Sequence, residues 1–146
     1  MSSFAKRVLV LWLLTLLSSH NVLGGNDTGV QYPRGFSLFP TIHVRVTNTL
    51  EGGLDLTVHC KSRDDDIGVQ FLHPNAFFQF KFKVNFFATT LFFCGFRWKD
   101  AFHWFNIYDA NRDQNRCKNC YWIVKKSGPC LFANDNSTDC YSWNKS

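Results

Sequence analysis

The fold of this chain is decided by two alternating segments in residues 41–72, which read TIHVRVTNTLEGGLDLTVHCKSRDDDIGVQFL. Apolar residues occupy every second position in residues 42–46 and again in residues 54–60. Because successive side chains of a strand point to opposite faces, each segment is predicted to be a half-buried strand. The connector, residues 48–53, contains Gly-Gly, which tolerates the positive φ of a chain reversal. We therefore expect the two strands to pair as a hairpin.

The rest of the chain repeats this pattern in short runs. In residues 78–86, Phe and Val alternate with Gln, Lys and Asn, which predicts an aromatic inner face and a basic outer face. Residues 89–98 are apolar on both faces, as in a central strand. Shorter runs occupy residues 69–72, 102–108 and 117–124. The runs predict an all-β fold, a small antiparallel β-sandwich of seven or eight strands.

The amino terminus has the pattern of a secretory signal peptide. Lys6 and Arg7 precede an apolar run at residues 8–17, and small residues follow near Gly24, where a signal peptidase would cut. The run is far shorter than the ~20 residues that span a bilayer, so we expect a chain that is not membrane-embedded. The predicted organisation is a signal peptide (1–24), a flexible lead-in (25–40) and one domain (41–146).

The charge balance is mildly basic. The full chain carries a formal net charge of +5, and removal of the first 24 residues leaves 14 basic and 11 acidic residues, a net charge of +3. This balance suits weak attraction to acidic polymers or membrane surfaces. It gives no case for nucleic acid, which usually needs a concentrated basic patch.

Six cysteines follow the predicted cleavage site, and an even number in a secreted chain predicts three disulfides. A zinc or redox role for the C-x-x-C motif at residues 117–120 fits less well, because a β-type run follows the motif. The six are Cys60, Cys94, Cys117, Cys120, Cys130 and Cys140.

The spacing of the cysteines suggests part of their connectivity. Cys130 and Cys140 enclose a small polar loop, and we predict that they bond to each other. A bond within the C-x-x-C motif would close a tight ring. We therefore expect its two cysteines to bond to Cys60 and Cys94, in an order that the sequence leaves open.

Three consecutive aspartates, residues 64–66, follow the second strand. Calcium prefers several carboxylate oxygens, but consecutive side chains in an extended loop diverge, and their spacing does not match an EF-hand loop. We expect instead a turn in which an aspartate side chain accepts backbone N–H groups. No metal or other cofactor is predicted.

Sugar attachment is predicted at N-x-S/T sequons, which a secreted chain exposes to glycosylation. Asn26 lies in the lead-in and Asn136 lies in the loop between Cys130 and Cys140. Asn144 also fits the pattern, although its position at the end of the chain suits the modification less well.

No constellation of catalytic residues emerges from the sequence, and we expect a protein that is not an enzyme. A secreted ribonuclease would need two histidines in a shared cleft, and the chain has no His-Gly-Leu-Trp-Pro-like motif. A secreted hydrolase that uses His59 or His103 is kept as an alternative, ranked third after the two interpretations given below.

Motifs spread in order over residues 42–124 carry a family resemblance. They are Asn48-Thr-Leu, the run 54–60 ending in His-Cys, Lys61-Ser-Arg-Asp-Asp-Asp-Ile-Gly, Thr90-Leu-Phe-Phe-Cys, Phe105-Asn-Ile-Tyr-Asp and Cys117-Lys-Asn-Cys-Tyr-Trp. Together they resemble the plant self-incompatibility S1 family, the S-protein homologues. The Cys130 and Cys140 pair and the abundance of Phe depart from the family pattern and indicate a divergent homologue.

The resemblance implies a signalling or recognition ligand of the plant apoplast whose partner is a plasma-membrane receptor protein. The founding members of the family look like stigma-secreted determinants that meet a receptor on the pollen surface. The second interpretation is an apoplastic defence or inhibitor protein that acts on a microbial or cell-wall target. The sequence leaves the oligomeric state open.

Three polar loops are predicted to contact the partner, because loops on a rigid β scaffold often carry recognition. We call them the first loop (residues 48–53), the second loop (61–68) and the third loop (109–116). The candidate contact residues are Asn48, Glu51, Lys61, Arg63, Asp64, Asp65, Asp66, Asp109, Arg112, Asp113 and Arg116.

Overall fold

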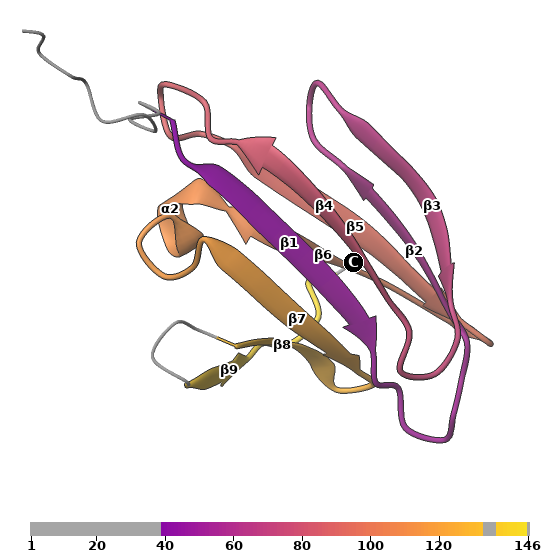
Figure 1. The fold of residues 1–146 in the computed structure, drawn as a ribbon. Helices are drawn as coiled ribbons and strands as arrows, with labels where there is room; N and C mark the ends of the chain where they lie inside the picture. The colour runs from indigo at the N-terminus through magenta and orange to yellow at the C-terminus, as the bar shows by residue number, and fades with distance from the viewer. Residues whose placement is uncertain (1–38, 133–136, 146) are drawn as a thin grey trace, which may run out of the picture. The chain divides into compact units, whose positions relative to one another are not determined.

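Within residues 39–132 and 137–145, which the computed structural model describes, nine strands form two sheets that pack face to face (Figure 1). One sheet has the order β4-β1-β7-β8-β9 and the other the order β3-β2-β5-β6. The elements are β1 (Thr41–Asn48), β2 (Leu56–Lys61), β3 (Asp66–Leu72), β4 (Phe77–Lys83), β5 (Leu91–Trp98), β6 (Ala101–Asp109), α2 (Ala110–Asp113), β7 (Asn119–Lys125), β8 (Gly128–Phe132) and β9 (Thr138–Cys140).

The predicted all-β sandwich is confirmed, with one difference in strand direction. β1 and β7 run parallel, with His43 opposite Asn119, whereas all other strand pairs are antiparallel. A parallel pair needs a long crossover connection. The chain supplies one, because it builds the whole four-stranded sheet between β1 and β7.

The predicted hairpin between the first two strands is wrong. β1 pairs with β4 and β7, and β2 pairs with β3 and β5, so the first loop carries the chain from one sheet to the other. Gly52 and Gly53 do take the expected positive φ, 85° and 64°. Alternation shows that a segment is a half-buried strand, but it does not show which strand is its neighbour.

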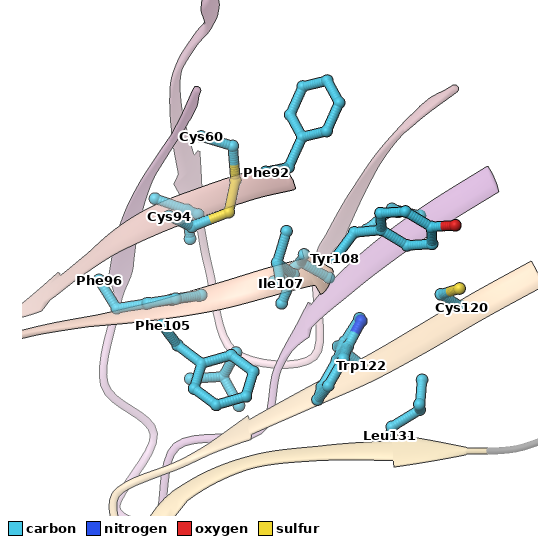
Figure 2. Packing of buried hydrophobic residues seen from close by; sticks show 14 of the residues in the cluster. Cys60, Phe92, Cys94, Phe96, Phe105, Ile107, Tyr108, Cys120, Trp122 and Leu131 are labelled. Atoms are coloured by element: carbon cyan, nitrogen blue, oxygen red, sulfur yellow. A yellow bond between two sulfur atoms is a disulfide. The ribbon is translucent and has the colours of Figure 1, made fainter. Parts of the chain in front are cut away.

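The core lies between the sheets and is rich in aromatic rings (Figure 2). Trp122 of β7 is fully buried, and its ring packs edge-on against Phe105 of β6 across the sandwich. On the other side of the core, Phe82 of the edge strand β4 contacts Phe92 and Tyr108. The predicted aromatic inner face of residues 78–82 therefore packs on the core.

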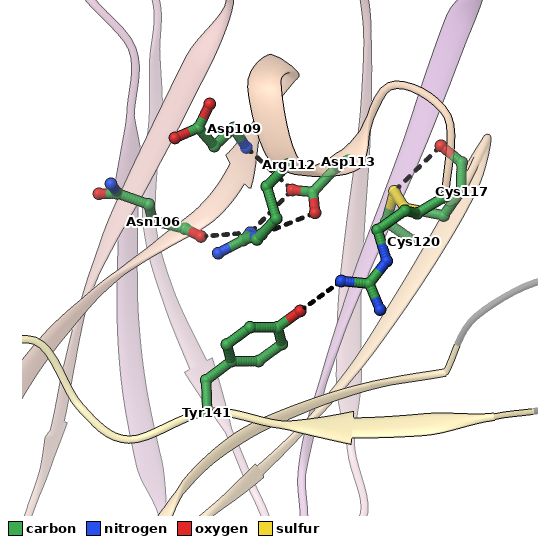
Figure 3. The surroundings of a disulfide bond; sticks show 8 residues. Asn106, Asp109, Arg112, Asp113, Cys117, Cys120 and Tyr141 are labelled. Atoms are coloured by element: carbon green, nitrogen blue, oxygen red, sulfur yellow. Dashed lines mark hydrogen bonds and ion pairs between the residues drawn. A yellow bond between two sulfur atoms is a disulfide. The ribbon is translucent and has the colours of Figure 1, made fainter.

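The disulfides differ from the predicted connectivity in two of three bonds. Cys60 and Cys94 are direct partners on β2 and β5, and they bond to each other inside the core (Figure 2). Cys117 and Cys120 bond to each other at the start of β7 (Figure 3), with Cα atoms 5.2 Å apart, which is within the usual range for a disulfide. Cys60 and Cys94 are directly opposite each other on neighbouring strands and are satisfied by their own bond, so the motif in the other sheet closes on itself and the predicted cross-bonds do not form.

The carboxy-terminal segment contributes more structure than its polar composition suggests. β8 and β9 extend the five-stranded sheet, and the predicted bond between Cys130 and Cys140 joins them. Trp143 then packs on Phe96 and Trp98. Gly128 has φ +142°, and a Cβ there would lie 1.8 Å from the carbonyl oxygen of Tyr141, so only glycine fits beside the returning tail.

Candidate recognition site

Two of the three predicted contact loops lie at the same end of the sandwich. In the four-stranded sheet Lys61 is opposite Phe93, and Leu91 is opposite Asp109, which brings the second and third loops to the end where β5 begins. The first loop comes between β1 and β2, so it lies at the opposite end of β2 from the second loop. There Thr49 N–H donates to the carbonyl of Val124. The structure therefore separates the first loop from the other two.

The second loop is a tight turn organised by Ser62. The Ser62 hydroxyl accepts from the backbone N–H groups of Asp64 and Asp65, at 3.2 and 2.9 Å, and Ser62 N–H donates to the carbonyl of Asp65. Arg63 and Asp64 form an ion pair at the tip, and their side chains are 90% and 74% exposed. The turn thus presents one cation and two carboxylates to solvent on a short, hydrogen-bonded support.

The third aspartate of the run has a different role. Asp66 accepts from the backbone N–H of Gly68 at 2.8 Å, which is the predicted kind of turn, and it also binds His59 and Lys61 at 2.7 and 3.2 Å. The hydrogen bond from His59, followed by the one from Gly68, lowers the pKa of Asp66 to about 2. Lys61 and Asp66 are therefore engaged with each other, although both remain partly exposed.

A turn that the sequence prediction missed lies next to the second loop. Residues 78–86 are predicted to form one strand with Phe86 on its inner face, and residues 89–98 the next, but β4 ends at Lys83, β5 begins at Leu91 and Phe86 is 77% exposed. Asn85 holds this turn. Its side-chain amide donates to the Thr89 hydroxyl and accepts from the Thr89 N–H, and its backbone N–H donates to the Thr90 hydroxyl. Asn85 followed by Thr89-Thr90 is the signal that could have predicted the turn.

A pocket of about 400 Å³ opens between the second loop and the turn at residues 84–90. Residues 62–65 form one wall, and Lys83, Asn85 and residues 89–93 form the others. Its volume is within the range of small-ligand pockets. Its lining offers cations, carboxylates, hydroxyls and an amide beside exposed aromatic rings, which suits recognition of a polar segment of another molecule.

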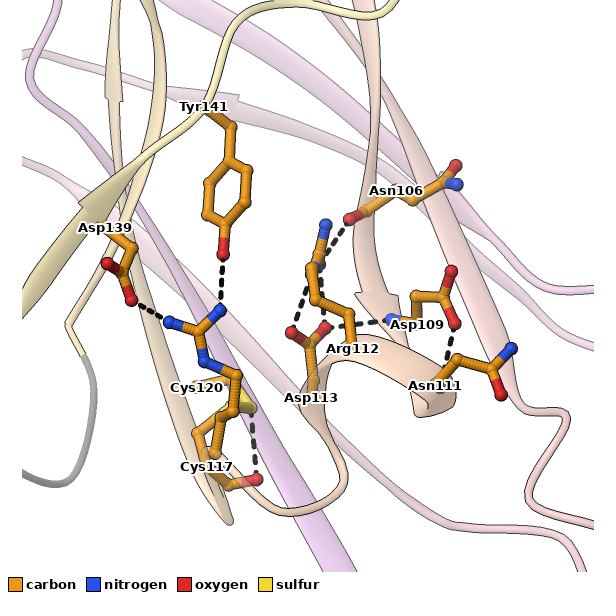
Figure 4. A network of polar contacts seen from close by, with 10 residues as sticks. Asn106, Asp109, Asn111, Arg112, Asp113, Cys117, Cys120, Asp139 and Tyr141 are labelled. Carbon is orange, nitrogen blue, oxygen red and sulfur yellow. Dashed lines mark hydrogen bonds and ion pairs between the residues drawn. A yellow bond between two sulfur atoms is a disulfide. The ribbon is translucent and has the colours of Figure 1, made fainter.

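The third loop is built into the scaffold, contrary to the prediction. Asp113 is fully buried, and both of its oxygens bind the guanidinium of Arg112 at 2.7 Å (Figures 3 and 4). Arg112 also donates to the carbonyl of Asn106, and Asp109 N–H donates to Asp113. Asp109 itself caps α2 by accepting from Asn111 N–H.

Aromatic rings surround the guanidinium of Arg112. Its carbon lies 5.1 Å from the ring centres of Phe105 and Tyr141 and 5.2 Å from that of Trp122. Burial, with added repulsion from Asp113, raises the pKa of the neighbouring Tyr108 hydroxyl to about 12. Arg112 and Asp113 therefore hold the loop on the core and are not contact residues.

Arg116 joins the third loop to the carboxy-terminal strand. It donates to the Tyr141 hydroxyl at 2.8 Å and forms an ion pair with Asp139 (Figure 4). Its side chain is 37% exposed, so part of it can still be reached from solvent. Within the third loop, the most exposed polar side chains are those of Asn111, Gln114 and Asn115, which the sequence prediction did not select.

Asn48 of the first loop is also a scaffold residue. It is fully buried, and its side-chain amide donates to the carbonyls of Leu54 and Leu72, at 2.8 and 3.0 Å. Glu51 is exposed and accepts from the N–H of Lys126, and this hydrogen bond lowers its pKa. Asn48 is thus excluded as a contact residue, and Glu51 lies away from the other candidates.

The structure does not bring the candidate hydrolase histidines together. His59 points outward from the four-stranded sheet toward Asp66, whereas His103 stacks on Trp143 on the inner side of the same sheet. Among the described residues, no group of three or more His, Cys, Asp or Glu side chains is placed to hold a metal ion. No helix in this part of the chain is long and apolar enough to cross a membrane.

Several sequence predictions fall outside the described residues. The signal peptide, Asn26 and Asn136 belong to residues 1–38 and 133–136. Asn144 is described and half-buried, and its backbone N–H donates to the carbonyl of Trp104.

Comparison with solved structures agrees with this architecture. A structure of SPH (Self-Incompatibility Protein Homologue) proteins, described as a widespread family of small, highly stable, secreted proteins from plants, aligns with a TM-score of 0.55. The alignment covers 73% of this chain and 97% of that chain at 18% sequence identity. At this identity the likeness establishes the fold.

Comparison of sequences establishes the family. A family model described as plant self-incompatibility protein S1 matches residues 43–143. S-protein homolog 3 of Arabidopsis thaliana is 46% identical over 107 residues, which cover 69% of this chain and 71% of the relative. S-protein homolog 4 of the same plant is 40% identical over 144 residues, which cover 94% and 90%. From its motifs, its fold and these matches, the chain belongs to the plant self-incompatibility protein S1 family, the S-protein homologues.

Proposed function

We propose that this protein is a secreted recognition ligand of the plant apoplast that binds a plasma-membrane receptor through the second loop and the turn at residues 84–90. The observation that carries the proposal is the pocket of about 400 Å³ between these two segments, with Arg63 and Asp64 exposed on its rim. Secretion is supported by the signal-peptide pattern and by the description of the SPH proteins as secreted. Sugar chains on Asn26 and Asn136 are part of the same proposal.

The chemistry of this end favours binding over turnover. A partner segment entering the pocket would meet carboxylates, a guanidinium and hydroxyls, supported by turns that Ser62 and Asn85 fix with hydrogen bonds. Such pre-organised polar groups lower the entropic cost of association. The exposed rings of Phe86 and Phe87, 77% and 79% accessible, supply apolar area beside them.

Receptor capture on living cells tests the proposal. The purified, disulfide-intact mature protein is cross-linked to pollen and to other plant cells, and the captured proteins are identified. We expect a saturable membrane-protein partner, with capture lost in the variant R63Q/D64N. The matched control is K99Q/D100N, which changes an adjacent, exposed pair of the same charge types in the β5–β6 turn.

Two outcomes would contradict the proposal. Equal capture by R63Q/D64N and K99Q/D100N would exclude the second loop as the contact. Recovery of only microbial or cell-wall components would instead support a defence or inhibitor protein, and the family relationship would then describe ancestry more than function.

A further inference from the structure

The outer face of the five-stranded sheet carries more cations than carboxylates, although Glu51 of the first loop is close enough to Lys125 to interact with its charge. The outward positions of β4 and β1 alternate with the buried ones, and they hold Lys81, Lys83 and Arg45. Lys125 lies on the same face of β7, and no Asp or Glu occupies an outward position on the described parts of β4, β1, β7 and β8. We call this surface the basic face. Its excess of positive charge attracts anions.

Arg45 is the structural centre of the basic face. Its guanidinium carbon lies 4.3 Å from the ring centre of Phe77 and 4.9 Å from that of Tyr121, so the cation is stacked between two half-exposed rings. One N–H group donates to Gln79 at 3.3 Å, and the buried Nε has no hydrogen-bond partner. The guanidinium has five N–H donors. It is therefore held in one orientation with donor capacity left over.

The outer face of the four-stranded sheet also has an arginine over an aromatic ring, with the guanidinium carbon of Arg97 5.0 Å from the ring centre of Phe102, but its charge balance differs. On the four-stranded sheet, Lys61 and His59 both contact Asp66, so its charges are partly neutralised. Lysines at the edge of a sheet also protect it against pairing with other chains. That role accounts for Lys81 and Lys83 on edge strand β4, but not for Arg45, which lies one strand further in.

We infer that the basic face binds a linear acidic polysaccharide, a polyuronate whose repeated carboxylates pair with these cations. Lys81 and Lys83 are two residues apart on one strand, about 7 Å. On the adjacent strand Arg45 is opposite Gln79, which makes it the diagonal neighbour of Lys81, about 7–8 Å away. Cations spread over neighbouring strands of an open sheet suit an extended polymer better than one small anion. The exposed ring of Phe132, opposite Tyr121 on the neighbouring strand, can pack on the apolar face of a sugar ring.

Two features favour a polyuronate over nucleic acid. Single-stranded nucleic acids need free aromatic faces on which bases stack, whereas Phe77 and Tyr121 each hold Arg45 against one face. The choice of a wall-type polyanion rests on the extracellular location in the proposed function. Lys83 also lines the proposed receptor pocket. Lys81, Arg45 and Lys125 do not line it, so these three residues distinguish the two proposals.

Binding of de-esterified polygalacturonate to the purified, disulfide-intact protein tests the inference. Affinity is measured at low and at physiological salt, with fully methyl-esterified pectin as the uncharged polymer. We expect binding to the charged polymer only, weakening as salt rises. K81Q/K83Q is expected to weaken it about tenfold, because two ion pairs are lost. R45K keeps the charge but removes the planar stack on the rings, so its affinity should lie between those of the wild type and K81Q/K83Q.

The matched control is K61Q/R97Q, which removes the same charge from outward positions of the four-stranded sheet. It should weaken binding less than about twofold, and circular dichroism confirms that each variant is folded. Equal losses in K81Q/K83Q and K61Q/R97Q would overturn the inference, as would equal binding of methyl-esterified pectin. Tighter binding of single-stranded RNA or of anionic lipid vesicles at equal charge concentration would also overturn it. Because this assay uses purified protein, its failure leaves the receptor proposal untouched.

Discussion

The second and third loops have similar compositions and lie at the same end of the sandwich, yet they have opposite roles. Each contains an arginine directly followed by an aspartate, Arg63-Asp64 and Arg112-Asp113. The first pair is 90% and 74% exposed, whereas the second pair is 22% and 0% exposed. The same dipeptide is thus a solvent-exposed ion pair in one loop and an internal anchor in the other.

The difference comes from what each loop meets in the folded protein. The arginine of the third loop enters a ring of aromatic side chains contributed by β6, β7 and the carboxy-terminal tail. Buried charges persist in proteins when they are paired and hydrogen-bonded, and Asp113 supplies that pairing. The second loop turns over the end of β2 and β3, where its charges stay in water. Mutations that act differently on the two loops test this contrast.

The largest effect is expected from Arg112→Ala. It leaves Asp113 buried without its partner and should lower the free energy of unfolding by about 3 kcal/mol. The measurement is urea unfolding of the disulfide-intact protein, with Arg63→Ala as the matched control. A loss below about 1 kcal/mol for Arg112→Ala would show that the third loop is not anchored as we describe.

Asn48→Ala extends the contrast to the first loop. The substitution removes two hydrogen bonds to buried carbonyls and the one that the side chain accepts from Leu50 N–H. We expect a loss of about 2 kcal/mol. Glu51→Gln, at an exposed position of the same loop, serves as the control and should change stability by less than about 0.5 kcal/mol. Similar effects of both substitutions would refute a scaffold role for Asn48.

Acid pH tests the role of Asp66 in the second loop. Its pKa is lowered from 3.8 to about 2 in the folded protein. Between about pH 4 and pH 2 the unfolded state therefore binds more protons, and the stability that Asp66 contributes is lost as the pH falls. Asp66→Asn should flatten the decline of melting temperature over this window. A wild-type decline that Asp66→Asn does not alter would contradict this assignment.

The smallest effect on stability is expected from R63Q/D64N. Both side chains are exposed and their ion pair is open to solvent, so the free energy of unfolding should change by less than about 0.5 kcal/mol. Thermal unfolding measures this directly. A loss above 1 kcal/mol would mean that this pair, like Arg112 and Asp113, supports the fold, and the contrast between the loops would disappear.

Sequence reasoning predicted the elements of the fold better than their partners. Alternation located the strands around Val44, Val58, Phe80 and Trp122 because burial on one face leaves a local signal. It could not show that β1 and β2 belong to different sheets, since pairing depends on residues far apart in the chain. The turn at residues 84–90 was missed because Phe86 continues the apolar period while Asn85 ends the strand.

The candidate site shows the same difference between local features, which the sequence predicts, and long-range contacts, which it does not. The exposed second loop could be predicted from its polar residues, because its hydrogen bonds join neighbours such as Ser62 and Asp65. The burial of Asp113 could not be predicted, because the rings around its partner Arg112 come from positions as far apart in the chain as Phe105 and Tyr141. The basic face likewise combines Lys81 of β4, Arg45 of β1 and Tyr121 of β7, which only the sheet order makes neighbours.

The sequence by itself determined the family, the β-sandwich class and the bond between Cys130 and Cys140, because motifs, period and short cysteine loops are local properties. The bond between Cys117 and Cys120 is equally local, and the sequence argument rejected it only because the ring would be tight. Only the tertiary structure decided the bond between Cys60 and Cys94, the parallel pairing of β1 and β7, and which polar loop is exposed. The physical reason is that burial and pairing depend on the whole set of packed neighbours, and a charged residue has no fixed role until those neighbours are in place.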